Sequence, residues 1–479
     1  MDYWNKGNIF LQNLKDNKDF RLLLLIFGFA VTVRMMMPLY IINSDRTDTL
    51  SLMSYSSHGQ IFTYIQAFVL ENTQQYFQNL DIVTEYYLPY SMLLSIPLYI
   101  FKLTDSPNTI MISIMSFQAL IDSFGCFIIF CIVNRTKKKH LALGAAGLYA
   151  IWLPSIFYSY HIMCEALIPV LTLVNGLLFI RFYENRTIYN VLLLGIGSGA
   201  VFTIRPDNIL LAFFVGIYLL LMNEFFKKKV LFILLFCIGG IGFNQLTIQG
   251  LRSSLNYSEA DSTLAIGLYN ALGENPGTYK GIRFYSDEDA YKYSIKKAID
   301  YRDERNVKFE FINSILSNSP LSAYITEVIV EKPVLYIDWL TQRFVHYFSA
   351  HNYVGFITYF ISSFPQPQSF VSVYGYRFSS IYNFFKIIDY ILFVLFLSGV
   401  FSLWHEKKMR ILMWMYIGVL VSHIPTQVGE VFFHNDKEHI FNNPAFLLGM
   451  VTLWPIFIPF GLSKLKNMIL FMFLGRSYE

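Results

Sequence analysis

The sequence predicts an all-α, polytopic membrane protein with about ten transmembrane helices. Of its 479 residues, 54% are hydrophobic and only 15% are charged, and the mean hydropathy is +0.43. Soluble domains average about 25% charged residues, so this composition indicates a chain that lies largely in lipid. Apolar segments alternate with clusters of Lys and Arg, and two long polar, aromatic-rich segments interrupt this alternation.

The basic clusters predict the orientation of the chain. Cytoplasmic loops of membrane proteins carry an excess of Lys and Arg. Six clusters recur between the apolar segments: Lys15/Lys18/Arg21, Arg135–Lys139, Arg181/Arg186, Lys227–Lys229, Lys407/Lys408/Arg410 and Lys464/Lys466. The net charge of +4 is small, which argues against nucleic acid as a partner. We therefore expect all six clusters, and both termini, on the cytoplasmic side of the plasma (inner) membrane.

A crossing needs about 20 apolar residues, which places the predicted spans in chain order. They lie at 21–43, 110–133, 141–157, 161–181, 188–204, 208–223, 230–250, 383–403, 411–428 and 443–461. The first run is too long for a cleavable signal peptide and lacks a small-residue cleavage site, so a signal anchor is expected. All four cysteines lie in apolar spans without a CxxC pair, which indicates small buried residues rather than disulfides or metal ligands.

The segment 89–103 decides the number of crossings. It is apolar enough to cross, but it is short and contains Pro89 and Pro97. A crossing here would place Arg135–Lys139 and every later cluster outside. We therefore expect a re-entrant or interfacial helix on the outer face. The alternative is a true crossing together with a further one elsewhere.

Three regions follow from this topology. A transmembrane module covers 1–250 and includes a first outer loop at 43–108, a large outer loop covers 251–380, and C-terminal transmembrane helices cover 381–479. The first loop contains an amphipathic stretch around Ile61–Val69, which is typical of a helix lying in the membrane interface. The second loop has mixed charges at 287–310 and an aromatic stretch at 333–347, so interfacial helices are expected in both loops.

Carboxylates at membrane level are candidates for function because they are costly there. Asp45 and Asp48 follow the first span, where a carboxylate can act as a general base; the alternative is a solvated start of a loop. Glu165 lies about one turn inside the outer end of a span, with His161 on the same helical face; the alternative is a structural hydrogen bond. Asp122, deep in a span, is expected to fix helix packing.

Outer-face cations are candidates for binding a phosphate. Arg205, in the tight link Arg205-Pro206-Asp207, can hold a phosphate oxygen through charge-assisted hydrogen bonds; the alternative is an internal pair with Asp207. The second outer loop adds candidates on aromatic-rich sequence: Arg343, His346, His351 and Arg377. A cationic, aromatic lining suits a lipid phosphate that carries a sugar, whereas the alternative is an interfacial aromatic belt.

The absent motifs narrow the chemistry further. The sequence contains no GxxxxGK[ST] phosphate loop, no HExxH zinc motif, no GxSxG elbow and no βαβ pattern. A nucleotide-sugar donor needs a soluble nucleotide-binding domain. Any energy-rich donor is therefore expected to be reached from the membrane.

Several segments, taken in order, resemble a known family. They are Arg34, Asp45–Asp48, YYLPYSMLLSIPLYIF at 86–101, NRTKKKHLALGAAGLYAIWLPSIFYS at 134–159, HIMCEAL at 161–167, LLGIGSGAVFTIRP at 193–206 and LYNALGENPGTYKG at 268–281. Over roughly 20–280, the chain is similar to GT-C glycosyltransferases of the bacterial family-39 type. These are related to protein O-mannosyltransferases and to the aminoarabinose transferases of lipid A. The resemblance implies a GT-C-like fold in which 86–101 lies on the outer face.

The resemblance also implies an activity. A sugar would move from a polyprenyl-phosphate carrier to a lipid, glycan or protein acceptor on the extracytoplasmic face. The family's catalytic acid maps to Asp45 or Asp48 and its second acidic position maps to Glu165. The register of the amphipathic stretch instead places His58 near the usual acid, so the identity of the base stays open among these three. The residues expected to contact substrate are Tyr87, His161, His346 and His351.

Alternative functions remain open at this point. A flippase or transporter usually shows repeats with interrupted spans at matching positions, and the sequence shows no such symmetry. A glycan polymerase or ligase is a third reading. No cofactor is assigned. Asp45, Asp48 and Glu165 could hold one divalent cation through hard oxygen ligands, although base chemistry at neutral pH does not require one.

Overall fold

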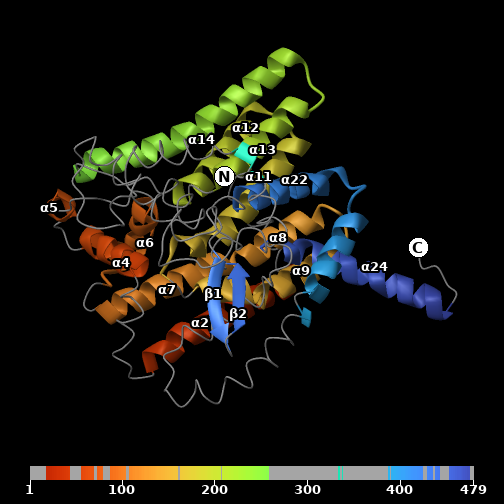
Figure 1. The fold of residues 1–479 in the computed structure, drawn as a ribbon, viewed down its shortest axis with the longest axis horizontal. Helices are drawn as coiled ribbons and strands as arrows, with labels where there is room; N and C mark the ends of the chain where they lie inside the picture. The colour runs from red at the N-terminus through yellow and green to blue at the C-terminus, as the bar shows by residue number, and fades with distance from the viewer. Residues whose placement is uncertain are drawn as a thin grey trace, which may run out of the picture.

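The computed structural model is mostly helical, with one short β-hairpin (Figure 1). The structure describes residues 18–43, 56–69, 73–78, 87–103, 107–159, 162–205, 208–257, 333–334, 337, 387–388, 390–423, 429–434, 437–442 and 452–474. The account that follows concerns these residues.

The N-terminal part of the bundle contains two helices that break in mid-course. α2 (Lys18–Asn43) packs against α7 (Pro107–Ser123), α8 (Gly125–Asn134) and α9 (Lys139–Ala150). The predicted span 110–133 is nearly continuous, with a turn at Phe124 between α7 and α8. The predicted span 141–157 is divided at Ile151 and Trp152 into α9 and α10 (Leu153–Ser159). Pro154 lies in the first turn of α10, where its missing N–H is not needed.

The next five elements form the centre of the bundle. They are the 3₁₀ turn η1 (Cys164–Leu167), α11 (Ile168–Glu184), α12 (Ile188–Ile204), α13 (Ile209–Leu221) and α14 (Phe226–Leu255). α12 and α14 touch backbone to backbone, because a Cβ on Gly195 would lie 2.4 Å from the carbonyl oxygen of Phe236 and one on Gly199 would lie 2.5 Å from that of Gly240. Small residues at four-residue spacing permit this approach in membrane helices.

The C-terminal region adds helices on one side and departs from the all-α prediction. A helix at Tyr390–Ser402 precedes α22 (Lys407–His423), which packs on α11 and α13. The strands β1 (Gly429–His434) and β2 (Lys437–Asn442) pair antiparallel, with His434 opposite Lys437. The last helix, α24 (Trp454–Leu474), begins and ends later than the predicted span 443–461.

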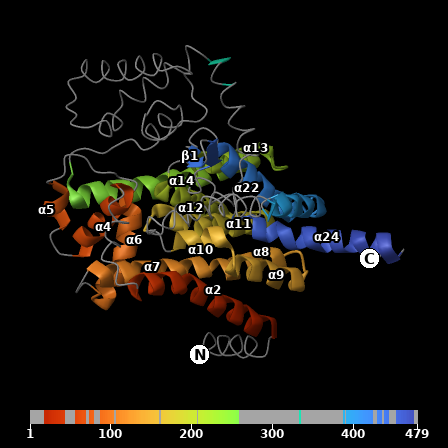
Figure 2. The ribbon, with the colours of Figure 1, turned by 60° about the horizontal axis from the view of Figure 1, so that its bottom comes forward.

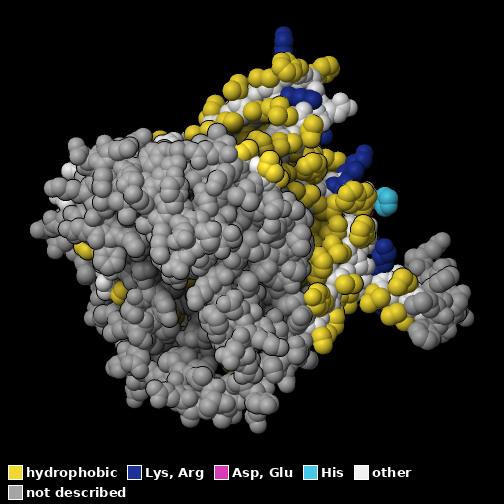
Figure 3. All heavy atoms as spheres, in the orientation of Figure 1, with side chains coloured by type: hydrophobic (Ala, Val, Ile, Leu, Met, Phe, Trp, Pro, Cys, Tyr) yellow, Lys and Arg dark blue, Asp and Glu magenta, His cyan; other side chains and the backbone are white. Residues whose placement is uncertain are grey.

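One end of the bundle, here the basic end, is held together by ion pairs. Lys139 pairs with Asp19 at 3.4 Å and Lys408 with Glu184 at 2.7 Å, and Arg135 also pairs with Glu184. Arg186 and Lys228 both pair with Glu224, at 2.7 and 3.0 Å. These pairs join the starts of α2 and α9 to each other, the end of α11 to the end of α8 and the start of α22, and the residues after α13 to the start of α14 and the link before α12. Figure 3 shows Lys and Arg side chains along one edge of the molecule, over the starts of α14 and α22.

The other end of the bundle, here the far end, carries the helices of the first outer loop. α4 (Ser56–Val69), α5 (Thr73–Gln78) and α6 (Tyr87–Phe101) gather where α7 begins and α14 ends (Figures 1 and 2). α4 packs on α6, and α5 and α6 both contact α14. The first residues of α6 are buried, whereas Tyr99, Ile100 and Phe101 at its end are exposed.

The segment between α2 and α7 contains α6. α2 starts at the basic end and has 26 residues. The run α7–α8 finishes at the basic end. At a rise of about 1.5 Å per residue, both helical runs are long enough to extend from the basic end toward the far end, where α6 also lies (Figure 2). That α6 does not cross the membrane stays a prediction.

Three helices are long and apolar enough to cross a membrane: Thr109–Asn134, Cys164–Glu184 and Phe226–Leu255. Four shorter apolar helices accompany them, at Tyr87–Phe101, Ile188–Ile204, Leu211–Leu221 and Tyr390–Ser402. The protein is thus embedded in a membrane. The total of ten crossings and the GT-C fold stay predictions.

Candidate functional site

Two of the predicted site residues come together at the far end. Nη1 of Arg205 donates a hydrogen bond to Oε1 of Glu165, although the two residues are 40 positions apart in the sequence. Glu165 lies in η1, just before α11, and Arg205 follows the last residue of α12. Both side chains are largely buried. The predicted alternative, a pair between Arg205 and Asp207, cannot be compared, because Asp207 lies outside the described residues.

Local structure favours a charge of the right sign at each position. Glu165 precedes the N-terminus of α11, where the helix dipole stabilises an anion, and Arg205 lies at the C-terminus of α12, where it stabilises a cation. Pro169 occupies the first turn of α11 and so helps the helix to begin directly after η1. The two helix ends therefore bring opposite charges together at the far end.

Three further polar side chains surround this pair. The thiol of Cys164 donates to Oε2 of Glu165 at 3.2 Å. The hydroxyl of Tyr90, on α6, lies close enough to Cys164 and Glu165 to interact electrostatically with both. The amide nitrogen of Asn208 donates to the backbone oxygen of Arg205 at 3.4 Å. Glu165, Arg205, Cys164, Tyr90 and Asn208 are here called the far-end cluster.

The far-end cluster offers the two charges that group transfer from a phosphate requires. A guanidinium holds phosphate oxygens through parallel N–H donors, and a carboxylate accepts a proton or orients a hydroxyl. Because the pair is buried, removal of one of its two charges would destabilise the folded state, since the other charge would be left buried without a partner. An incoming anion or hydroxyl can take over part of the contact.

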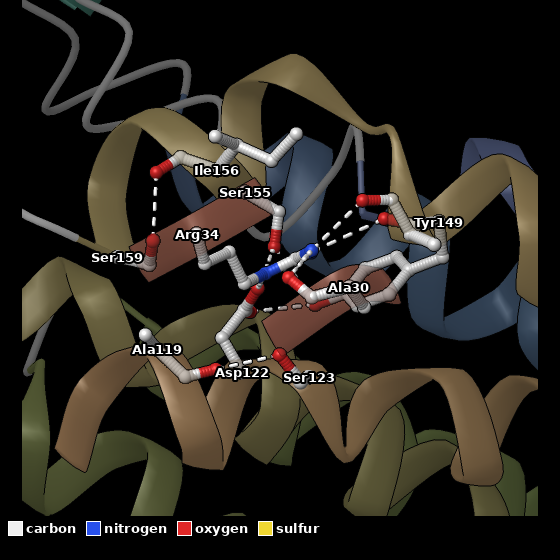
Figure 4. A network of polar contacts seen from close by, with 10 residues as sticks. Ala30, Arg34, Ala119, Asp122, Ser123, Tyr149, Ser155, Ile156 and Ser159 are labelled. Carbon is white, nitrogen blue, oxygen red and sulfur yellow. Dashed lines mark hydrogen bonds and ion pairs between the residues drawn. The ribbon is translucent and has the colours of Figure 1, made fainter. Parts of the chain in front are cut away.

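A second buried ion pair lies deeper in the bundle (Figure 4). Nε of Arg34 on α2 donates to Oδ2 of Asp122 on α7 at 2.5 Å. The hydroxyl of Tyr149 donates to Oδ1 of Asp122 at 2.7 Å, and the hydroxyl of Ser155 donates to Oδ2 at 2.6 Å. Arg34 also lies over the Tyr149 ring, 5.4 Å from its centroid. Arg34, Asp122, Tyr149 and Ser155 are here called the mid-bundle network.

The mid-bundle network explains how a helix can break inside the bundle. Where α9 ends, its last carbonyl groups lose their helical partners. Nη1 of Arg34 donates to the carbonyl of Ala150 at 2.9 Å, and Nη2 donates to that of Tyr149 at 3.1 Å. Nη1 also reaches Ala30 on its own helix at 3.3 Å. Backbone groups in a membrane must be bonded within the protein, and Arg34 supplies that bonding, with Asp122 as its counter-ion.

The remaining predicted site residues divide between described and undescribed parts of the chain. Tyr87 is buried in the first turn of α6. His58 belongs to α4, but its side chain is outside the described residues, as are Asp45, Asp48, His161, Arg343, His346, His351 and Arg377. Within the described ranges no three His, Cys, Asp or Glu side chains gather as a metal site. The divalent cation predicted at Asp45, Asp48 and Glu165 therefore stays a prediction.

Sequence reasoning singled out Glu165 and Arg205 separately and did not join them. It did not single out Tyr90, although this residue lies in the segment 86–101 that carries the family resemblance, and it did not single out Asn208. Arg34 was noted only through the family resemblance, and Asp122 as a packing residue, which agrees with its bonds in the mid-bundle network. The presence of one Arg and one Asp within apolar spans was the available signal, because such charges pair with each other in membranes.

No protein-family model matches the sequence, and no curated protein matches it at a significant level.

Proposed function

We propose that this protein is a membrane glycosyltransferase that moves a sugar from a polyprenyl-phosphate carrier to an acceptor at the extracytoplasmic face. The observation that carries the proposal is the buried Glu165–Arg205 pair at the far end, opposite all the ion pairs of the basic end. If the basic end faces the cytoplasm, this pair faces the other side. It lies there beside α6, whose exposed apolar end suits a lipid interface.

The proposed reaction assigns a role to each charge. An acceptor hydroxyl attacks the anomeric carbon of the sugar, the bond between that carbon and the phosphate oxygen breaks, and the carrier leaves as a phosphate. Arg205 holds the phosphate and stabilises the charge that develops on it. The hydroxyl proton passes to a carboxylate or imidazole, for which Asp45, Asp48 and His58 are the candidates. Glu165 orients Arg205 and the acceptor.

The mid-bundle network argues against a transporter. Transport sites commonly lie near the bilayer midplane, on broken helices whose free backbone groups bind the substrate. Here the broken helix α9–α10 has its end carbonyls already bonded by Arg34. The charged side chains at mid-bundle are therefore occupied in holding the fold, and the far-end cluster is the better site.

The activity is tested with purified full-length protein in proteoliposomes, supplied with radiolabelled sugars on undecaprenyl phosphate and with extracted membrane acceptors. Glu165→Gln and Arg205→Lys are expected to lower transfer about 100-fold per amount of folded protein, which is measured for each variant. The matched control is Glu184→Gln, which alters an ion-paired carboxylate at the basic end and should retain transfer. Movement of labelled lipid across the bilayer without transfer to any acceptor would instead support a flippase.

Orientation is tested by single cysteines in a cysteine-free background. Lys102 follows α6 at the far end, and Lys138 precedes α9 at the basic end; both are exposed. Lys102→Cys is expected to react with an impermeant maleimide added to intact cells, whereas Lys138→Cys should react only after the membrane is permeabilised. Equal labelling of both in intact cells would contradict the proposed sidedness.

A further inference from the structure

Two buried polar atoms of the far-end cluster have no hydrogen-bond partner in the described part of the chain. They are the hydroxyl oxygen of Tyr90, which has the backbone N–H of Met163 nearby but not in hydrogen-bond geometry, and Oδ1 of Asn208. The Tyr90 side chain is fully buried and Asn208 is almost so. The Tyr90 hydroxyl lies near the backbone of Met163, two residues before Glu165, while Asn208 is bonded to the backbone of Arg205 through its N–H and its amide nitrogen. One unpartnered atom thus flanks each member of the ion pair.

Buried polar atoms without a hydrogen-bond partner require a physical explanation. A buried polar group without a partner destabilises the folded state, and most buried groups in native proteins are paired. The neighbouring charged groups make the contrast plain, since Glu165 bonds both Arg205 and Cys164. Two unpaired atoms close to a bonded ion pair indicate positions that a ligand completes.

The chemistry of the two atoms indicates the ligand group. The phenol of Tyr90 has a proton to donate, and Oδ1 of Asn208 can only accept. A phosphate has acceptors alone, and an ammonium has donors alone. A hydroxyl both donates and accepts, so a compound with several hydroxyl groups satisfies both positions without placing another charge beside Glu165 and Arg205.

α6 connects this position with the lipid-facing surface. Its first residues, including Tyr90, are buried against the far-end cluster, and its last residues, Tyr99, Ile100 and Phe101, are 64–69% exposed. A ligand with a hydroxyl-rich head and an apolar tail can therefore follow one helix from the buried cluster to the lipid.

We propose that Tyr90 and Asn208 bind hydroxyl groups of the sugar on the lipid-linked donor, next to the Glu165–Arg205 pair. This assignment rests on the proposed glycosyltransferase function and deepens it. Tyr90 donates to one hydroxyl, Asn208 accepts from another, and Arg205 contacts the phosphate. The selection among sugars then depends on which ring positions present hydroxyls toward α6 and the start of α13.

The test is a binding titration of the full-length protein in nanodiscs. The probes are undecaprenyl phosphate carrying glucose, mannose or galactose, and undecaprenyl phosphate without a sugar. Wild-type protein should bind one glycosylated lipid more tightly than the bare lipid. Tyr90→Phe and Asn208→Ala should each weaken that lipid's binding about 3- to 10-fold, the value of one or two neutral hydrogen bonds, and should leave binding of the bare lipid unchanged.

Two matched control residues have the same kind of buried, unpartnered side-chain atom but lie outside the far-end cluster. The hydroxyl of Tyr416 on α22 is also buried and not in hydrogen-bond geometry, with the side chain of Trp454 nearby. Asn190 has an unpartnered Oδ1 near the basic end, where its amide nitrogen donates to Asn185. Tyr416→Phe and Asn190→Ala should bind every probe as the wild type does. Thermal unfolding supplies a second readout: Tyr90→Phe should unfold at or above the wild-type temperature, because it removes an unsatisfied group.

The outcomes separate this inference from the proposed function. Equal wild-type affinity for all four lipids, or affinities of Tyr90→Phe and Asn208→Ala that match the controls, would overturn the sugar site even if transfer is observed. A lowered unfolding temperature for Tyr90→Phe with unchanged binding would make Tyr90 structural. A third outcome is that the wild type binds one glycosylated lipid preferentially, both variants lose this preference, and no sugar is transferred to any acceptor. This outcome would support the sugar site and contradict the glycosyltransferase function.

Discussion

The bundle contains two buried Arg–carboxylate pairs that differ in what surrounds them. In the mid-bundle network, Arg34 bonds Asp122 and three backbone carbonyls, and Asp122 also accepts from Tyr149 and Ser155. In the far-end cluster, Arg205 bonds Glu165 while the neighbouring Tyr90 and Asn208 keep unpartnered atoms. Burial of a charged pair therefore does not by itself identify a ligand-binding site. Such a site is indicated by buried polar atoms next to the pair that still lack hydrogen-bond partners.

The strongest test removes each pair completely. Arg34→Met with Asp122→Leu should lower the free energy of unfolding by about 1–3 kcal/mol, because the carbonyl of Ala150 loses the donor that Arg34 supplies and the hydroxyls of Tyr149 and Ser155 lose their acceptor. Glu165→Leu with Arg205→Met should stay within about 1 kcal/mol of the wild type, since apolar replacement of a whole buried pair is often neutral, and it should abolish transfer. Chemical unfolding in detergent and the transfer assay measure the two effects.

The opposite ranking of the two double variants would break the comparison. A stable Arg34→Met/Asp122→Leu protein would show that the end of α9 finds other donors. An unfolded Glu165→Leu/Arg205→Met protein would make the far-end pair structural as well.

A smaller change sharpens the claim that the mid-bundle network is rigid. A Cβ on Gly125 would lie 2.4 Å from the Tyr149 ring, which is held by its bond to Asp122. Gly125→Ala should therefore lower the free energy of unfolding by about 1–3 kcal/mol, as overpacking does. The control is Gly144→Ala on α9, where a Cβ meets nothing within 4 Å and alanine favours the helix. Equal unfolding midpoints for the two variants would show that Tyr149 moves freely.

The smallest effect is expected at the basic end, where ion pairs are solvated. Hydrogen bonds from Arg186 and then Lys228 lower the pKa of Glu224 below its ordinary value of 4.5. A lowered carboxyl pKa stabilises the folded state above the unfolded-state pKa, and this contribution disappears as the pH falls through the folded-state pKa. Glu224→Gln should thus lower the unfolding temperature slightly at neutral pH. The difference from wild type should decrease as the pH falls below about 4.5; a constant difference would mean that another interaction of Glu224 matters.

Hydrophobic segment length predicted most of the helices but not their breaks. The span 188–204 coincides with α12, and 208–223 and 230–250 fall close to α13 and α14. The turns at Phe124 and at Ile151–Trp152 were missed because the apolar runs continue through them. The break at Ile151–Trp152 is stabilised by Arg34, which is distant in sequence. The span 443–461 was wrong in position, since α24 continues through Lys464 and Lys466 into a second apolar run.

The candidate site was predictable in its charges and not in its geometry. Glu165 and Arg205 stood out because each lies at the edge of an apolar span. Their pairing depends on where α11 begins relative to the end of α12, which composition does not encode. Tyr90 and Asn208 are ordinary residues in sequence, and only their buried, unpartnered atoms distinguish them.

The bonds of Arg34 also constrain the order in which the chain assembles. α2 is synthesised before its partners in this network: Asp122 lies 88 residues after Arg34, and Ala150, whose carbonyl Arg34 also bonds, lies 116 residues after it. During synthesis, the guanidinium is therefore present in α2 well before its counter-ion and its backbone acceptors are made. α2 must stay beside the insertion machinery or in a hydrated position until α7 and α9 arrive, and the interrupted helix α9–α10 can settle in lipid only when this earlier helix is already in place.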